Sequence, residues 1–250
     1  MEKYIDMQMP LTSLDHNELS EELNNLTALE RISWAYNQLG DGLFALTSAG
    51  VDSALMVEHV AKSNLPISFI FLNTGFLPKE TLVFKDELTS KYGVQILEVG
   101  PSQEEIEIIR HKNLWETDLE TYTRITKLEP LSRAIEEYGI TGLLSAVRSD
   151  QTENRSSLNI IGTGNDGELR IHPFLDWSQP MIDAYFTEQK LPRNSLFSKG
   201  YGSVEDAHTM KPGANRQGRA RMECGLHLVD GKLVRQKPKA EFSQPNSRRI

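Results

Sequence analysis

Short apolar segments that alternate with helical segments are the feature of this sequence that most constrains its fold. Buried strands are predicted at residues 43–47, 66–72 and 94–99, with helices over residues 53–62 and through about residue 92. Strand, turn, helix and strand in this order predict an α/β fold, a mostly parallel sheet with helices on both faces. Ligands of such sheets bind at the carboxyl ends of the strands. The small polar loops at residues 47–53 and 73–75 follow strands, so we expect the functional site there.

The sequence before residue 43 and after residue 99 predicts further helices and strands of the same α/β architecture. An apolar period near 3.6 predicts one helix over residues 18–39. Further elements are predicted as helices at residues 104–109, 131–138 and 177–189, a strand at 142–147, and a hairpin that turns at Asn165-Asp166-Gly167. The domain organisation that we expect is a loosely ordered N-terminus (1–15), an α/β domain (16–210), a C-terminal segment (211–236) and a frayed tail (237–250).

A single cysteine, Cys224, narrows the possible protein classes. One thiol permits no intrachain disulfide and no zinc or iron–sulfur site made wholly of cysteines. The N-terminus lacks the pattern of a signal peptide, and no apolar run approaches the roughly 18 residues that span a bilayer. The net charge of −8 disfavours binding to nucleic acid or to a membrane surface. We therefore expect a cytoplasmic protein in a reducing compartment.

The loop at residues 47–53 (TSAGVDS) has the chemistry of an anion-binding turn. Gly50 lets the backbone approach an anion, Ser48 and Ser53 offer hydroxyl donors, and the following helix offers its N-terminal amides. No Gly-Lys-Ser/Thr follows, so the loop is not a Walker loop. An ordinary strand-to-helix turn capped by Asp52 or Ser53 is the alternative interpretation. The loop is similar in part to the Ser-Gly-Gly-x-Asp-Ser pyrophosphate loop of the adenine nucleotide alpha hydrolase superfamily, with Ala49 at the second position.

A basic cluster surrounds the only thiol. Residues 211–235 carry six Lys and Arg side chains against two acidic ones, an excess of +4 in an acidic chain. A guanidinium beside a cysteine stabilises the thiolate, which is the nucleophilic form, and it attracts anions. Arg219 and Arg221 therefore favour Cys224 as a nucleophile. The alternatives are a solvated charged face and a small buried cysteine.

Five segments together resemble the phosphoadenylyl-sulfate (PAPS) reductases of assimilatory sulfate reduction. They are residues 73–81 (NTGFLPKET), 127–134 (KLEPLSRA), 146–151 (AVRSDQ) with Arg155, 175–177 (LDW) with 191–192 (LP) and 200–204 (GYGSV), and 223–227 (ECGLH). The last one matches the C-terminal catalytic signature of that family without change. The resemblance runs from about Leu19 to His227.

The resemblance implies a reaction and a set of site residues. Cys224 would attack the sulfonyl sulfur and become an S-sulfocysteine, and an outside dithiol from thioredoxin or glutaredoxin would release sulfite. Because the chain has no second thiol, the electrons must come from such a partner. The implied catalytic residues are Cys224, His227 and Arg221. The implied substrate-binding residues are Ser48, Gly50, Ser53, Asn73, Thr74, Lys127, Arg148, Gln151, Arg155 and Arg219. A homodimer is expected.

Relatives that reduce adenylyl sulfate (APS) commonly hold an iron–sulfur cluster on four cysteines. The aligned positions here are Tyr122, Thr123, Asp206 and Thr209, so no cluster is expected and the 3′-phosphorylated substrate is favoured. The chain departs from the family pattern at Asp52, Asn73, Ser149 and Glu205; Ser149 replaces an arginine that could contact phosphate. The other hypotheses are an APS reductase without a cluster, an ATP pyrophosphatase-type adenylating or sulfur-transfer enzyme, and a nucleotide-binding protein without catalysis.

Overall fold

The computed structural model describes residues 16–208, 210, 227–229 and 232–234. Its helices are α1 (His16–Asn24), α2 (Ala28–Leu39), α3 (Ala54–Ser63), α4 (Lys79–Tyr92), α5 (Gln103–Lys112), α6 (Leu114–Thr117), α7 (Leu119–Thr123), α8 (Glu129–Tyr138) and α9 (Gln179–Glu188). Its strands are β1 (Leu43–Thr47), β2 (Ser68–Leu72), β3 (Ile96–Val99), β4 (Gly142–Leu144), β5 (Ile161–Thr163), β6 (Leu169–Ile171), β7 (His227–Val229) and β8 (Lys232–Val234).

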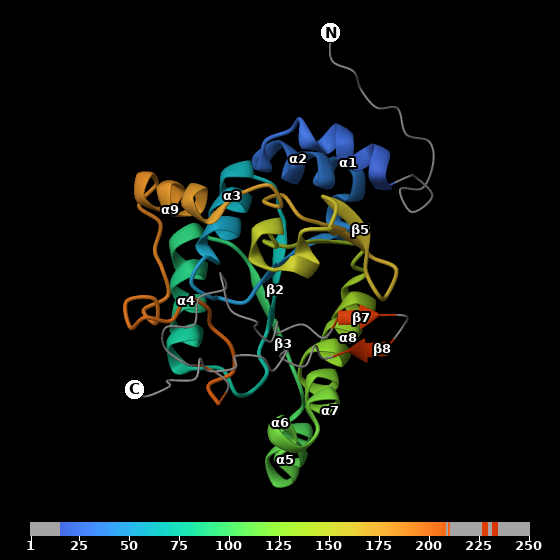
Figure 1. Ribbon diagram of the computed structural model, residues 1–250, viewed down its shortest axis with the longest axis vertical. Helices are drawn as coiled ribbons and strands as arrows, with labels where there is room; N and C mark the ends of the chain where they lie inside the picture. Colours follow the sequence, from blue (N-terminus) through green and yellow to red (C-terminus); the bar gives the residue numbers. More distant parts are fainter. Residues whose placement is uncertain (1–15, 209, 211–226, 230–231, 235–250) are drawn as a thin grey trace, which may run out of the picture.

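Six of these strands form one sheet in the order β3-β2-β1-β4-β6-β5 (Figure 1). Neighbours from β3 to β6 run parallel, with Ala45 of β1 opposite Phe69 of β2 and Leu144 of β4. The edge strand β5 pairs antiparallel with β6 through the hairpin predicted at Asn165-Asp166-Gly167, where Gly167 has a φ of 84°. The predicted α/β class is confirmed, and β7 and β8 pair separately as a two-stranded sheet.

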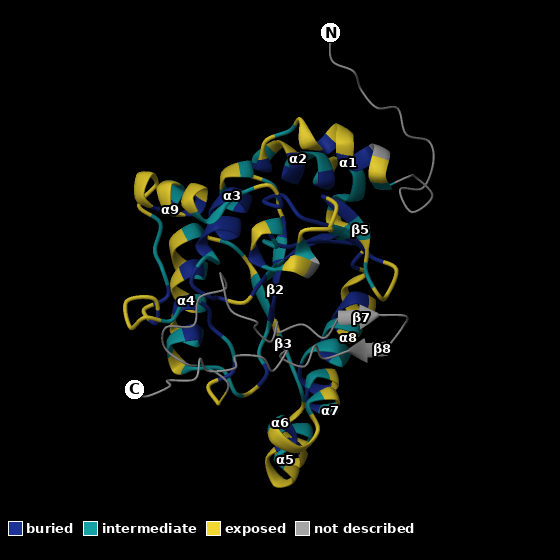
Figure 2. Ribbon diagram, in the orientation of Figure 1, coloured by how far each residue is buried: buried dark blue, intermediate teal, exposed yellow. Residues whose placement is uncertain are grey.

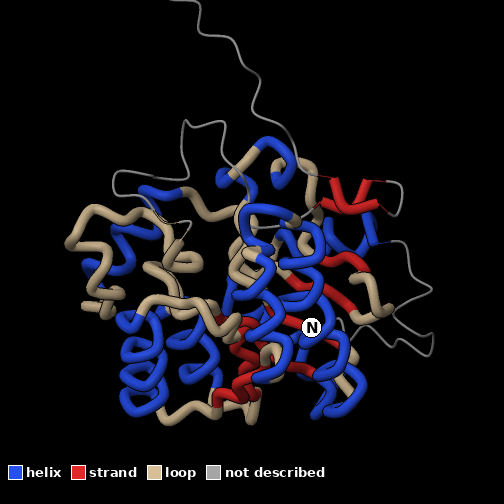
Figure 3. Tube along the Cα trace, turned by 90° about the horizontal axis from the view of Figure 1, so that it is seen from below, coloured by secondary structure: helices blue, strands red, loops and turns tan. Residues whose placement is uncertain are grey.

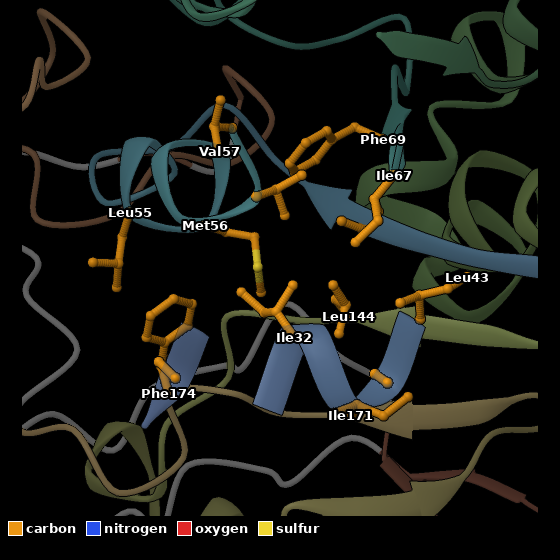
Figure 4. Packing of buried hydrophobic residues seen from close by; sticks show 14 of the residues in the cluster. Ile32, Leu43, Leu55, Met56, Val57, Ile67, Phe69, Leu144, Ile171 and Phe174 are labelled. Carbon is orange, nitrogen blue, oxygen red and sulfur yellow. The ribbon is translucent and has the colours of Figure 1, made fainter. Parts of the chain in front are cut away.

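Alternating side chains direct the helices to opposite faces of the sheet. Phe69 and Phe71 of β2 pack with α2, α3 and α4, whereas Ile70 between them packs with α8. The two helical layers lie on either side of the strands (Figures 1 and 3), and their sheet-facing sides are buried (Figure 2). Figure 4 shows the larger core, in which Met56 of α3 lies close to Ile32 of α2.

The segment predicted as one helix over residues 18–39 forms two helices in the structure. The expectation of a single helix over residues 18–39 is wrong, because α1 ends at Asn24 and α2 begins at Ala28. Thr27 accepts a hydrogen bond from the Glu30 backbone, and the Glu30 carboxylate accepts one from the Thr27 amide. This capping box starts a new helix within a continuous apolar pattern.

Other element boundaries follow the predictions with two differences. The predicted strand at residues 142–147 ends at Leu144, which frees the chain after it to turn into the loop that carries Arg148. Residues 114–128, which no sequence pattern assigned, form α6, α7 and the π-helical segment η3 (Arg124–Leu128). These elements and α5 project from one end of the molecule (Figure 1).

Three short 3-10 turns complete the described structure: η2 (Gly40–Gly42), η4 (Ser149–Gln151) and η5 (Glu153–Arg155). Among the described helices, none combines the length and the apolar character that crossing a membrane requires.

Candidate active site

The loop between β1 and α3 (residues 48–53), which we call the first loop, is held by hydrogen bonds among its own polar groups and Thr47. The Gly50 amide donates to Ser53 Oγ at 2.8 Å, and the Ala49 amide donates to Thr47 Oγ1 at 3.2 Å. Ser53 occupies the N-cap position of α3 but makes no side-chain cap bond to the helix. A hydroxyl that accepts one hydrogen bond still has a proton to donate, so Ser53 can bind an anionic oxygen. Ala49 has a φ of 45°, in the left-handed region.

Asn194 holds this loop from a distant part of the chain. Its amide nitrogen donates to the Ala49 carbonyl at 2.9 Å, and its amide oxygen accepts from the Leu196 backbone at 3.0 Å. The side chain is buried. Val51 of the same loop packs with Leu196, two residues after Asn194, and with Val204. Asn194 was not among the predicted site residues, since a single asparagine in an aperiodic stretch gives no local signal of a partner 145 residues away.

Asp52 lies between two guanidinium groups. Its carboxylate is 3.7 Å from Arg148 Nη1 and 3.5 Å from Arg193 Nη1. The Arg193 guanidinium lies 4.3 Å from the ring centres of both Phe186 and Phe197. The negative charge that Asp52 adds to the loop is therefore compensated by two largely buried cations.

Arg148 uses separate nitrogens for separate partners. Nε donates to Asp150 at 2.9 Å and Nη2 donates to the Gln179 side chain at 2.8 Å, while Nη1 faces Asp52. The Gln151 side-chain oxygen accepts from the Arg148 amide at 3.3 Å and also from the Arg155 guanidinium. Arg148, Gln151 and Arg155, predicted as substrate-binding residues, thus form one connected group next to the first loop.

Two of the residues that depart from the family pattern bond to the protein itself. Ser149 Oγ donates to the Leu175 carbonyl at 2.8 Å. Asn73 donates to Glu98 at 2.7 Å, and its oxygen accepts from the Gly75 amide at 3.0 Å. Burial opposes ionisation of Glu98, but hydrogen bonds from Asn73 and Lys85 outweigh burial and hold the Glu98 pKa below its ordinary value. Asn73 therefore shapes the turn after β2.

A second polar group gathers around Asp206, close to this turn. Thr74 Oγ1 donates to Asp206 Oδ1, and the Tyr122 hydroxyl donates to Oδ2 at 2.7 Å. Lys127 Nζ lies 4.0 Å from Oδ2. The predicted residues Thr74 and Lys127 are thus brought together by the buried carboxylate of Asp206, which was not among the predicted site residues.

Tyr122 and Asp206 are also two of the positions that align with cluster-binding cysteines in APS-reducing relatives. Here they form a direct hydrogen bond. Across residues 16–208 and the other described positions, no three His, Cys, Asp or Glu side chains gather as a metal-binding set. Thr209 lies outside the described residues.

The structure describes some of the remaining predicted site residues and not others. Ser48 is exposed and Gly50 is buried in the first loop. A Cβ on Gly50 would lie 3.2 Å from Ser48 Oγ, tighter than ordinary contact. Cys224, Arg221 and Arg219 lie outside the described residues, and His227 begins β7.

His172 follows β6 at the same edge of the sheet and was also missed. It is buried, and burial lowers its pKa to about 4; the nearby charges of Arg170 and Arg155 act in the same direction. A hydrogen bond to the Ser145 backbone opposes this shift. The imidazole is therefore neutral near pH 7.

The phosphoadenosine phosphosulfate reductase domain family matches residues 42–212, more than half of the chain. The phosphoadenosine 5′-phosphosulfate reductase of Synechocystis sp. is 34% identical over 236 residues, which cover 89% of this chain and 94% of that protein. The protein of the same name from Photobacterium profundum is 32% identical over 227 residues, covering 85% and 88%.

Solved structures are also similar to this chain. The crystal structure of a PAPS reductase from Candida auris, a phosphate complex, has a TM-score of 0.72 at 25% identity, covering 81% of this chain and 99% of that one. The FMN adenylyltransferase of Candida glabrata, with a TM-score of 0.58 at 12% identity, shares the fold alone. The chain belongs to the phosphoadenosine phosphosulfate reductase family.

Proposed function

We propose that this chain reduces 3′-phosphoadenylyl sulfate to sulfite and adenosine 3′,5′-bisphosphate in assimilatory sulfate reduction. The observation that carries the proposal is the match to named PAPS reductases along nearly the whole chain, 89% of it for the Synechocystis protein. The motif residues of the loops at 48–53, 73–75 and 148–155 support it, since these loops follow β1, β2 and β4 at the carboxyl edge of the sheet. Arg148 is joined there to the first loop through Asp52.

The nucleotide would bind along this edge of the sheet. Ser48, Ser53 and the N-terminal amides of α3 are suited to phosphate oxygens, and Gly50 leaves room for them. Arg148, Gln151 and Arg155 offer further donors on one side. Asn73 and Thr74 shape the neighbouring turn, and Lys127 would meet the sulfate end of the substrate.

The chemistry would take place in two steps on Cys224. The thiolate, stabilised by Arg219 and Arg221, attacks the sulfonyl sulfur and forms a sulfur–sulfur bond. The sulfur–oxygen bond to the nucleotide breaks, and adenosine 3′,5′-bisphosphate leaves with the electron pair. His227 would act as an acid or as a structural support.

An external dithiol completes the reaction. One of its thiolates attacks the Cys224 sulfur and releases sulfite, and its second thiol resolves the mixed disulfide, so two electrons pass to the substrate. Thioredoxin or glutaredoxin fits this role because Cys224 is the only cysteine of this chain. No bound iron–sulfur cluster is required, and Tyr122, Thr123 and Asp206 offer no cysteine ligands. We further propose that the protein is a cytoplasmic homodimer. Light scattering, which measures the molar mass in solution, tests the dimeric state.

APS is the second candidate substrate. Ser149 stands in place of a phosphate-contacting arginine and bonds to the Leu175 carbonyl, so this position supplies no cation for a 3′-phosphate.

The decisive assay measures sulfite formation with thioredoxin, thioredoxin reductase and NADPH, using PAPS and APS in parallel. The proposal predicts sulfite from PAPS at a higher kcat/KM than from APS, and none with the Cys224→Ser variant. A higher kcat/KM for APS would establish the second candidate instead. Sulfite from neither substrate, or full activity of Cys224→Ser, would overturn the proposed function.

A further inference from the structure

The carboxylate of Asp206 is one of the most deeply buried charges in the described part of the chain. Its side chain is 3% exposed, and it contacts residues from three other parts of the fold. Thr74 comes from the turn after β2, Tyr122 from α7, and Lys127 from the π-helical segment η3. A buried carboxylate is costly unless it is fully hydrogen-bonded or paired, so such a convergence needs a reason.

Thr74, Tyr122 and Lys127 act on Asp206 in different ways. Thr74 Oγ1 donates to one carboxylate oxygen and the Tyr122 hydroxyl donates to the other at 2.7 Å. Lys127 Nζ is 4.0 Å from Oδ2, beyond hydrogen-bond distance but within the range of a strong Coulomb attraction. The hydroxyl groups of Thr74 and Tyr122 thus help to orient the Asp206 carboxylate, and this carboxylate attracts the Lys127 ammonium group across 4.0 Å.

The same residue connects two parts of the site. The Ala207 amide donates to the Phe76 carbonyl at 2.9 Å, so residues 206–207 lie against the turn after β2. Val204, two residues earlier, packs with Val51 of the first loop. Contacts to the loop after β1 and to the turn after β2 therefore fix the position of Asp206. Asp206 in turn links Lys127 to both of these loops.

We propose that Asp206 is a positioning residue that acts through Lys127, holding its ammonium group where the sulfonate of the substrate is transferred. Thr74 and Tyr122 serve to orient the carboxylate. The inference rests on the proposed function, because it assigns Lys127 to the sulfate end of the nucleotide. It requires that Asp206 influence sulfonate transfer but leave binding of the nucleotide without its sulfonate unchanged.

A double-mutant cycle with Lys127 tests this dependence. The variants are Asp206→Asn, Lys127→Met and the two combined, each mixed with PAPS without reductant. One turnover releases adenosine 3′,5′-bisphosphate, and its rate is measured by rapid quench. Affinity for adenosine 3′,5′-bisphosphate is measured separately by calorimetry.

We expect Asp206→Asn to slow the single turnover by about tenfold, the size of one lost interaction with a charged group. In the Lys127→Met background the same substitution should change the rate by less than about twofold, because its effect passes through Lys127. Affinity for the bisphosphate should stay the same in all variants. Asp166→Asn is the matched control, since Asp166 is an exposed carboxylate that accepts from Ser132, and its rate should equal that of the unmodified chain.

The results that would overturn the positioning role differ from those that would overturn the proposed function. A merely structural Asp206 would slow the turnover equally in both backgrounds and weaken binding of the bisphosphate, which would overturn the inference. If Asp206→Asn fails to fold, Tyr122→Phe replaces it in the cycle and should give a smaller loss with the same dependence on Lys127. Equal losses in both backgrounds would again refute the role. If the unmodified chain releases no bisphosphate from PAPS, the proposed function fails and the inference with it.

Discussion

Asp52 Oδ2 lies 3.7 Å from Arg148 Nη1, so an acidic residue of the first loop pairs with a buried cation on the loop after β4. Arg193 approaches the same carboxylate from the other side at 3.5 Å. Asp52, an acidic residue in the loop between β1 and α3, is thereby part of the scaffold that orients two arginines.

Replacement of Asp52 by Asn should destabilise the fold by about 2 kcal/mol, because two largely buried guanidinium groups lose a shared counter-charge. Urea unfolding followed by circular dichroism measures the change. Asp86→Asn is the control, since Asp86 is an exposed partner of Lys85 and its loss should cost less than about 0.5 kcal/mol. Equal stability of the Asp52 variant and the unmodified chain would contradict a structural role of the pair.

Asn194→Ala should reduce both stability and nucleotide affinity. It leaves the buried Ala49 carbonyl and the Leu196 amide without their side-chain partner, which costs about 1–3 kcal/mol. The released loop should also bind adenosine 3′,5′-bisphosphate more weakly in calorimetry. Asn159→Ala removes an exposed asparagine contact and serves as the control. Unchanged affinity in Asn194→Ala would show that the loop keeps its shape without this anchor.

Arg148→Lys should lower affinity for the nucleotide by about tenfold although the charge is kept, because an ammonium group lacks the fixed fork of a guanidinium. Arg148 addresses Asp52, Asp150 and Gln179 with three different nitrogens, which a single ammonium cannot reproduce. Binding is compared by calorimetry with Arg110→Lys, an exposed arginine paired with Glu107. Equal affinity in the two variants would argue against Arg148 as part of the binding site.

His172 should make the protein less stable in mild acid. The unfolded chain binds a proton on this histidine near pH 6.5, whereas the folded chain binds it only near pH 4. Between these values the unfolded state holds more protons, so stability falls as the pH falls, by up to about 3 kcal/mol. In His172→Leu the difference in unfolding free energy between pH 7 and pH 4.5 should shrink, whereas His111→Gln should retain it. An unchanged pH dependence in His172→Leu would contradict this assignment.

Much of the fold follows from local patterns in the sequence. The strands at Leu43–Thr47 and Ser68–Leu72 are apolar and bounded by polar turns, so their places and their shared carboxyl edge were predictable. The break before α2 depends on a capping box at Thr27, which interrupts an otherwise continuous apolar period. Residues 114–128 form short helices and a π-helical segment, for which the sequence gives no clear period.

The site was predictable in its motifs but not in its connections. The motif order placed Arg148, Gln151 and Arg155 in one group, and the structure joins them. Asn194 and Asp206 act on residues 145 and 132 positions away, and no local pattern encodes such contacts. Cys224, Arg219 and Arg221 lie outside the described residues, so the roles assigned to them stay predictions.

The most direct test of the central claim is the intact mass of the protein after incubation with PAPS in the absence of any reductant. Covalent catalysis on Cys224 predicts an adduct of about 80 Da, the mass of SO₃, on the unmodified chain and none on Cys224→Ser. Addition of reduced thioredoxin should remove the adduct and release sulfite. An unmodified mass after complete exposure to PAPS, or the same adduct on Cys224→Ser, would contradict the proposed reaction.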